Sequence, residues 1–179
     1  GFKYKDNTHF ASELILFSKD PELWKCRNCL SGFINNTISE LMAQKYYERS
    51  DSSSRWESLE FTSDKTKELI SFVTRQIKVY DHVLDFGCND GILLDYAKLK
   101  GAQTYGVEIS TASIEKAAKK GHQIRKNLNE FDKEVKFDMI FAMDVIEHMH
   151  NPNEFLADLS KRLKRNGKIV FLTGNINSM

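Results

Sequence analysis

Proline, glycine and long apolar runs are scarce in this chain. It has only 2 Pro and 9 Gly among 179 residues, and 41% of its residues are hydrophobic, so a packed core is expected rather than a long disordered segment. No apolar run approaches the roughly 18 residues that a membrane-spanning helix needs. The first residues also lack the basic segment followed by an apolar one that marks a secretory signal. The composition predicts a folded protein of ordinary domain size without a membrane span.

Net charge and cysteine are also scarce. Lys and Arg total 26 against 25 for Asp and Glu, a formal net charge of +1. Proteins that hold nucleic acid mainly by bulk charge usually carry a basic face, so nucleic acid is not expected as a partner. The three cysteines, Cys26, Cys29 and Cys88, cannot form a disulfide framework. Their odd number indicates a reducing compartment, and the expected location is the cytoplasm.

From residue 82 onward, apolar runs and helical patterns alternate. A helix is expected over residues 64–78, and Asn151-Pro152-Asn153-Glu154 resembles a capped helix start, with Asn166-Gly167 as the stop. Strands are expected at residues 82–86, 104–108, 122–125, 137–143 and 168–172. The run at 137–143 is too apolar to alternate, as in a strand covered on both faces. This order predicts an α/β fold with a doubly wound parallel sheet.

The first 60 residues show no such alternation. They contain both tryptophans, a pair of cysteines two residues apart and a polar, serine-rich stretch at 50–54. A helix is expected over residues 39–49, before that stretch. We therefore predict two parts: an appendage of residues 1–60 and a core domain of residues 61–179.

A cluster of glycine and acidic residues follows the first two strands of the core. The turn after the first strand contains Asp85, Gly87 and Gly91, and the second strand ends at Glu108. Glycine lets the backbone approach a ligand closely, and the following helix offers unpaired N–H groups. A carboxylate at the end of the second strand is well placed to accept hydrogen bonds from ribose hydroxyls.

The identity of the nucleoside follows from what the turn lacks. The dinucleotide pattern G-x-G-x-x-G is absent, because residue 89 is Asn and residue 92 is Ile. A carboxylate at residue 85 would repel a pyrophosphate, whereas it suits a ligand that carries an ammonium and a sulfonium. S-Adenosyl-L-methionine is such a ligand.

These segments resemble a known family. VLDFGCNDGILL and YGVEIS resemble motif I and the acidic ribose-binding loop of class I S-adenosylmethionine-dependent methyltransferases. The stretch from FDMIFAM to KIVFLTGN resembles that superfamily's fourth strand, its "VLEH" segment, the next helix and the fifth strand, so the match spans about residues 80–175. The resemblance implies a Rossmann-like methyltransferase sheet. It also implies a chain truncated after the fifth strand, since the family's sheet has seven.

The resemblance assigns roles to further residues. Asn89 stands where many members have glycine, and Asn127 stands where an Asp usually accepts a hydrogen bond from the adenine amino group. Ile109 and the backbone beside Leu128 would flank the adenine, while Cys88 is expected to be a small buried residue within the cofactor turn. The cofactor-binding residues expected are Asp85, Gly87, Cys88, Asn89, Gly91, Glu108, Ile109, Asn127 and Leu128.

Candidates for chemistry follow the fourth strand. A hydroxyl or amine acceptor must lose a proton on methylation, and Asp144 and His148 are the catalytic candidates, with Glu147 and His150 beside them. If residues 144–148 form one helical turn, Asp144, Glu147 and His148 share a face. The same segment resembles the metal-binding E-x-x-E-H segment of small-RNA 2′-O-methyltransferases, which provides an alternative. The nearby basic cluster at residues 161–165, which includes Arg162, is interpreted as a solvated helix end.

The two-cysteine segment resembles half of a zinc site. Cys26 and Cys29 are followed by a glycine and an aromatic, as in a zinc knuckle, but a closed structural site needs four ligands. The segment resembles the amino-terminal zinc-ribbon-like region of methyltransferases often found with sugar genes, in which a Tyr-Tyr helix follows. By that resemblance, structural zinc at the two cysteines and a lid at residues 45–56, including Tyr46 and Tyr47, are predicted.

Together these patterns predict a methyltransferase that uses S-adenosyl-L-methionine. The acceptor expected is a small molecule, with a sugar or sugar nucleotide favoured by the amino-terminal resemblance alone. The alternatives are a metal-dependent RNA 2′-O-methyltransferase and a truncated cofactor-binding module without its own activity.

Overall fold

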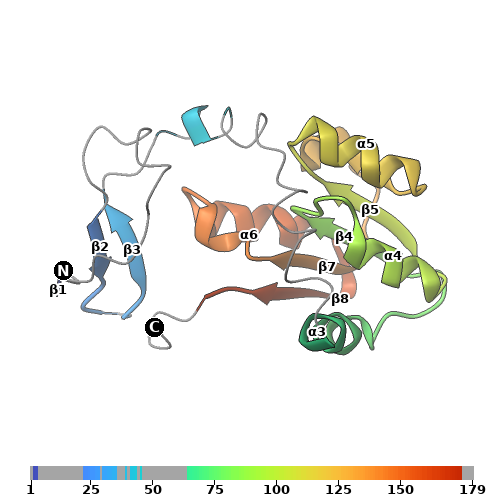
Figure 1. Ribbon diagram of the computed structural model, residues 1–179, viewed down its shortest axis with the longest axis horizontal. Helices are drawn as coiled ribbons and strands as arrows, with labels where there is room; N and C mark the ends of the chain where they lie inside the picture. The colour runs from blue at the N-terminus through green and yellow to red at the C-terminus, as the bar shows by residue number, and fades with distance from the viewer. Residues whose placement is uncertain are drawn as a thin grey trace. The chain divides into compact units, whose positions relative to one another are not determined.

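The computed structural model describes residues 2–3, 22–28, 30–35, 39, 41–43, 45 and 64–174 (Figure 1). The chain divides into two compact units, Gly1–Tyr46 with Asn175–Met179, and Tyr47–Gly174. The domain boundary predicted after residue 60 falls outside the described residues and stays a prediction. Among the described residues, no helix is both long and apolar enough to cross a membrane.

The first unit contains a small antiparallel sheet. Its strands are β1 (Phe2–Lys3), β2 (Glu22–Lys25) and β3 (Gly32–Asn35), in the order β1-β2-β3. The turn between β2 and β3 is closed by Cys26 N donating to Ser31 O (2.8 Å) and Leu30 N donating to Cys26 O (3.1 Å). These strands were not predicted from the sequence, because each has only two to four residues, too few for a visible alternation.

The second unit is built on a five-stranded parallel sheet. In the order β6-β5-β4-β7-β8, its strands are β6 (Gln123–Arg125), β5 (Gln103–Val107), β4 (His82–Phe86), β7 (Phe137–Met143) and β8 (Leu163–Leu172). All four neighbouring pairs are parallel. The doubly wound α/β prediction is therefore confirmed. The chain turns back between β4 and β7, which is the point where such sheets bind ligands.

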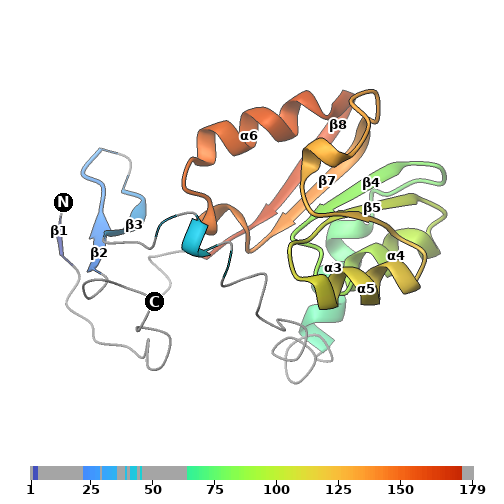
Figure 2. The same cartoon turned by 90° about the horizontal axis from the view of Figure 1, so that it is seen from above.

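Helices cover both faces of this sheet. Helices α3 (Asp64–Thr74), α4 (Ile92–Leu99) and α5 (Thr111–Lys119) lie on one face, and α6 (Pro152–Lys161) lies on the other (Figure 2). A hydrophobic core lies on each face of the sheet, and alternate residues of β4 and β7 point into one or the other. Val83 and Phe141 pack toward α4, and Leu84 and Ile140 pack toward α6. Short 3₁₀ turns, η2 (Leu128–Glu130) and η3 (Ile146–His148), follow β6 and β7. These loops, together with those after β4 and β5, form the carboxyl edge of the sheet.

The ends of α3 and α6 and the start of β8 differ from the sequence prediction by more than one residue. Helix α3 ends at Thr74, where turn bonds replace the helical ladder: Arg75 N donates to Phe72 O (3.4 Å) and Ile77 N donates to Thr74 O (3.0 Å). Helix α6 ends at Lys161, and β8 begins at Leu163, five residues before the predicted start. The register shifts within this pair, since Leu163 lies opposite Phe137 and Lys168 lies opposite Met139. The polar residues 164–167 therefore belong to an irregular strand start and do not extend the helix.

Candidate functional site

The turn of residues 87–91 lies at the centre of the carboxyl edge. It leaves β4, and Asp85 in that strand is paired with Gly106 of β5 on one side and Phe141 of β7 on the other. Gly87 N and Cys88 N both donate to Val107 O, at 2.8 and 3.1 Å. The turn is thus fastened to the end of β5, beside Glu108.

Two glycines in the turn have no room for a side chain. Gly87 has φ +77°, and a Cβ there would lie 2.8 Å from Val145 Cγ2. Gly91 has φ +84°, and a Cβ there would lie 2.9 Å from His122 Cδ2. Both values of φ are in the left-handed region that favours glycine. The close contact with Val145 also brings the loop after β7 against the turn after β4.

The Glu108 carboxylate is held by three backbone N–H groups. Asn89 N donates to Oε2 (2.9 Å), and Ile109 N and Ser110 N donate to Oε1 (2.8 Å each). The residue is only 8% exposed. A carboxylate has about four acceptor sites, so these donors fix its orientation and leave acceptor capacity on Oε2. Such a group can accept a hydrogen bond from a ligand hydroxyl without moving.

Asn89 is one of the two residues that depart from the pattern of the resemblance, and its backbone explains how it is accommodated. It has φ +48°, a left-handed conformation that Asn tolerates better than most residues. Its Oδ1 accepts a hydrogen bond from Ser113 Oγ (2.9 Å), which ties the turn to α5. Asn89 therefore occupies a left-handed position that glycine would also adopt readily, and its side chain adds an anchor to α5.

Asp85 carries a buried carboxyl group close to the carboxylate of Glu108. It is 5% exposed, and burial, followed by the negative charge of Glu108, raises the pKa of Asp85 to about 8. A cation placed beside this carboxyl would favour its ionised form. Cys88, next in the turn, packs inward with its sulfur close to Gly106. It is 4% exposed, and burial raises the pKa of its thiol, so the side chain is a packing element, as expected.

The loop after β6 carries the residues predicted beside an adenine. Leu128 is buried, whereas Asn127 is exposed and caps η2: its Oδ1 accepts from Asn129 N (3.0 Å) and its Nδ2 donates to Glu130 Oε1 (2.6 Å). The Asn127 carbonyl oxygen therefore already holds the loop and has one acceptor position left for a ligand.

Arg162 holds the same loop from α6, and sequence reasoning missed it. It is 7% exposed, and its guanidinium donates to three carbonyls, those of Asp132 (2.6 Å), Leu128 (2.9 Å) and Phe131 (3.1 Å). The interpretation of this basic cluster as a solvated helix end is wrong for Arg162. In the sequence, nothing distinguishes it from the exposed Lys161 beside it.

The catalytic candidates follow β7 at the same edge. Asp144 has φ +52°, and its backbone N–H donates to Leu172 O of β8 (2.8 Å). The 3₁₀ turn begins two residues later, so residues 144–148 do not form one helical turn, and the predicted common face is absent. Asp144 and His148 are both exposed.

The comparisons with known proteins agree with this geometry. The family described as "Methyltransferase domain" matches residues 56–178. The chain belongs to the methyltransferase-domain family. Two ubiquinone biosynthesis O-methyltransferases are similar to it. The one from Coxiella burnetii is 29% identical over 117 residues, which are 60% of this chain and 50% of that protein. The one from Bradyrhizobium diazoefficiens is 36% identical over 104 residues, 53% of this chain and 40% of that protein.

A solved structure shows the same fold. The DhpI–SAM–HEP complex superposes on this methyltransferase domain with a TM-score of 0.59 and 17% identity, over 75% of this chain and 67% of that one. The chain spans half or less of the length of the curated relatives named above.

The methyltransferase domain shows no cluster of metal ligands in the part that the structure describes. No three His, Cys, Asp or Glu residues there come together as a metal site would require, and this part includes Asp144, Glu147, His148 and His150. The metal-binding segment inferred from RNA methyltransferases therefore gains no support from the geometry. Cys26 is half-buried with a free thiol. Cys29 and the predicted lid residues Tyr46 and Tyr47 lie outside the described residues, so the zinc site and the lid stay predictions.

Proposed function

We propose that this chain forms the S-adenosyl-L-methionine-binding core of a methyltransferase that acts on a small-molecule acceptor. The observation that supports the proposal most directly is the pair of carboxyl groups, those of Asp85 and Glu108, beside the turn of residues 87–91. Asp85 is buried in β4, and Glu108 is held by three N–H groups at the end of β5. Their pairing with glycines that have no room for a Cβ makes a cradle suited to a cationic nucleoside.

The residues fit the cofactor by charge and by hydrogen-bonding capacity. Asp85, once ionised, would hold the ammonium of the methionyl group. Glu108 would accept hydrogen bonds from the ribose hydroxyls through its remaining acceptor capacity. Ile109 and Leu128 would flank the adenine, and Asn127 would accept from its amino group. Gly87, Cys88, Asn89 and Gly91 contribute the backbone of the turn.

The bound cofactor would supply a methyl group on a sulfonium, which is open to in-line displacement. His148 would take the proton from a hydroxyl acceptor, and Asp144 would contact the cofactor or the acceptor, since both residues follow β7 on the same edge. The contact between Val145 and the Gly87 position places their loop against the turn. Most of the acceleration would come from alignment and exclusion of water, so the loss of the His148 imidazole should lower the rate without abolishing cofactor binding.

Within this site, the chemical class of the methyl acceptor is indicated only by the similar proteins. Two similar proteins are named O-methyltransferases of ubiquinone biosynthesis, which favours a hydroxyl on a small organic molecule. A sugar acceptor rests on the amino-terminal resemblance alone. Metal analysis of the purified protein tests zinc at Cys26 and Cys29, and dependence of turnover on Mg²⁺ or Mn²⁺ would favour the RNA alternative.

The binding proposal is tested by calorimetry with S-adenosylmethionine. Replacing Glu108 by Ala should weaken binding about 10- to 100-fold, because hydrogen bonds to a charged group are lost. Glu115→Ala removes an exposed carboxylate of α5 and serves as the matched control. Because Glu108 also holds three N–H groups, Glu108→Gln, which retains one acceptor oxygen, is measured beside it. Unchanged affinity in both Glu108 variants would refute the assigned site.

A further inference from the structure

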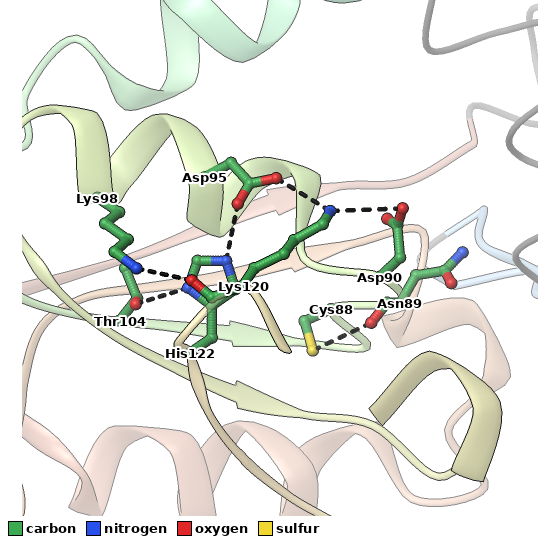
Figure 3. Close-up of polar contacts among 8 residues, drawn as sticks. All are labelled: Cys88, Asn89, Asp90, Asp95, Lys98, Thr104, Lys120 and His122. Carbon is green, nitrogen blue, oxygen red and sulfur yellow. Dashed lines mark hydrogen bonds and ion pairs between the residues drawn. The ribbon is translucent and has the colours of Figure 1, made fainter. Parts of the chain in front are cut away.

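A connected set of polar side chains lies next to the turn of residues 87–91 and has no role in the cofactor contacts assigned so far (Figure 3). His122, the residue before β6, is 4% exposed and makes contacts through both ring nitrogens. Its Nδ1 lies 2.8 Å from Thr104 Oγ1 of β5, and its Nε2 lies 2.9 Å from Asp95 Oδ1 of α4. An ionised carboxylate can only accept, so Nε2 donates to Asp95, and in the neutral ring Nδ1 accepts from the Thr104 hydroxyl.

The imidazole of His122 also packs directly against the turn. A Cβ on Gly91 would lie 2.9 Å from His122 Cδ2 and 3.3 Å from Nε2. The position of the ring therefore sets how closely residue 91 can approach the sheet. Since Gly91 is the N-cap of α4, the ring lies under both the turn and the start of the helix.

Asp95 connects the ring to the turn by two routes. Its backbone N–H donates to Gly91 O (2.8 Å), within the first turn of α4. Its Oδ2 accepts from Lys120 Nζ (3.0 Å), and the same ammonium lies 3.6 Å from Asp90 Oδ2 in the turn. Figure 3 shows this continuous path from His122 through Asp95 and Lys120 to Asp90. Thr104, by contrast, lies on β5, on the other side of the ring.

We propose that Asp95 and His122 are positioning residues for the cofactor, which hold Gly91 and the first turn of α4 where the ligand meets the backbone. The inference rests on the proposed function. The two ring nitrogens of His122 have different roles. The contact of Nε2 with Asp95 reaches the turn and governs affinity, whereas the contact of Nδ1 with Thr104 anchors the ring to the sheet and governs stability alone.

The test is calorimetry with S-adenosylmethionine on the full chain, together with thermal unfolding of each variant. His122→Leu removes both hydrogen bonds and should raise the Kd about tenfold, equivalent to ~1.4 kcal/mol. Asp95→Ala, at a side chain that is 40% exposed, should fold and should raise the Kd several-fold. His122→Gln keeps a donor toward Asp95 and should restore affinity to within about threefold of the native value.

Thr104→Val is the matched control. It removes the partner of Nδ1 and should lower the melting temperature while leaving the Kd within about twofold of the native value. Native affinity in folded His122→Leu or Asp95→Ala would overturn the inference, as would a loss in Thr104→Val equal to that in His122→Leu. A native protein that binds no S-adenosylmethionine would instead overturn the proposed function, so the two failures are distinguishable.

Discussion

Asp85 combines burial with a neighbouring negative charge, and its protonation is therefore coupled to folding. Burial and the charge of Glu108 raise its pKa in the folded protein from 3.8 to about 8. The folded state thus binds a proton that the unfolded state releases between these two values. The resulting stabilisation is complete below pH 4 and is lost as the pH rises through about 8. A cationic ligand reverses this preference, because it favours the ionised carboxylate.

The first prediction concerns Asp85→Asn in the ligand-free protein. Because Asn does not titrate, the variant should gain stability relative to the native protein as pH rises from 5 to 9, at a slope of up to ~1.4 kcal/mol per pH unit. Urea unfolding at three pH values measures this difference. A difference that does not vary with pH would contradict the protonation of Asp85 in the folded state.

Asp138→Asn should show the opposite sign and is the control. Burial acts to raise the pKa of Asp138, but hydrogen bonds from Lys164 Nζ and His82 N outweigh it and lower the pKa. The stabilisation from this carboxylate is present above its unfolded pKa and is lost as the pH falls through the folded value. The variant should be less stable than the native protein near pH 7, and the difference should shrink toward acid pH.

A second prediction at this scale concerns the left-handed backbone of Asn89. Asn89→Ala loses both the tolerance for φ +48° and the hydrogen bond from Ser113 Oγ, so the free energy of unfolding should fall by about 1–2 kcal/mol. Asn89→Gly recovers the backbone freedom and should lose less. Ser113→Ala measures the hydrogen bond alone. Urea unfolding of the three variants separates the two contributions, and an Asn89→Ala protein as stable as the native one would contradict the assignment.

Among the elements, β8 differs most from its sequence pattern, and the cause is the bulge at its start. Gly167 lies where the register with β7 shifts, and a Cβ there would meet Phe137 O at 2.8 Å and Leu163 Cδ2 at 2.9 Å. The backbone carbonyl cannot move without disturbing β7. Glycine is therefore required there by packing between strands, a constraint that local sequence does not display.

Gly167→Ala is the prediction that follows. The added methyl should lower the free energy of unfolding by about 1–3 kcal/mol, as expected for overpacking against backbone. Gly174→Ala is the control, because no atom lies within 4 Å of a Cβ at that exposed position. Denaturant unfolding of both variants checks the comparison. Equal stabilities would show that β8 can adjust at its start.

The elements that the sequence predicted well are those whose signals are local. The apolar runs of β4 and β7 indicated buried parallel strands, and the cap at Asn151 is confirmed, with Oδ1 accepting from Glu154 N (3.2 Å). The missed features depend on distant partners. The short strand β1 is defined by pairing Phe2 with Lys25, and the burial of Arg162 depends on carbonyls about thirty residues earlier.

The same distinction applies to the candidate site. Asp85, Gly87, Gly91 and Glu108 could be found because each lies near the end of a strand or in the turn that follows it, and parallel strands bring such positions to one edge. The His122–Asp95 contact could not be found, since it joins residues 27 apart whose spacing has no pattern. The left-handed turn at Asp144 was missed because the family resemblance indicates a segment and not its backbone conformation.

At the scale of the whole molecule, the described site residues with predicted cofactor contacts lie in one unit. They fall between residues 85 and 128, within the unit Tyr47–Gly174, and the helix α3 that packs beside α4 begins at Asp64. Ile70 and Thr74 of α3 are 4% and 0% exposed. A fragment of residues 61–179 therefore keeps α3 and the buried side chains that complete the core.

The last prediction is that this fragment folds and still binds S-adenosylmethionine. If residues 45–56 act as a lid, the fragment, which lacks them, should bind S-adenosylmethionine about tenfold more weakly than the full chain, a difference of ~1.4 kcal/mol. The melting temperature of the core should change little. Calorimetry and thermal unfolding of the fragment and the full chain measure the two effects. Full-chain Tyr46→Ala is the matched variant, and it should reproduce part of the loss in affinity. An unfolded fragment would contradict the boundary after residue 60, whereas a folded fragment with native affinity would contradict the lid and leave the boundary intact.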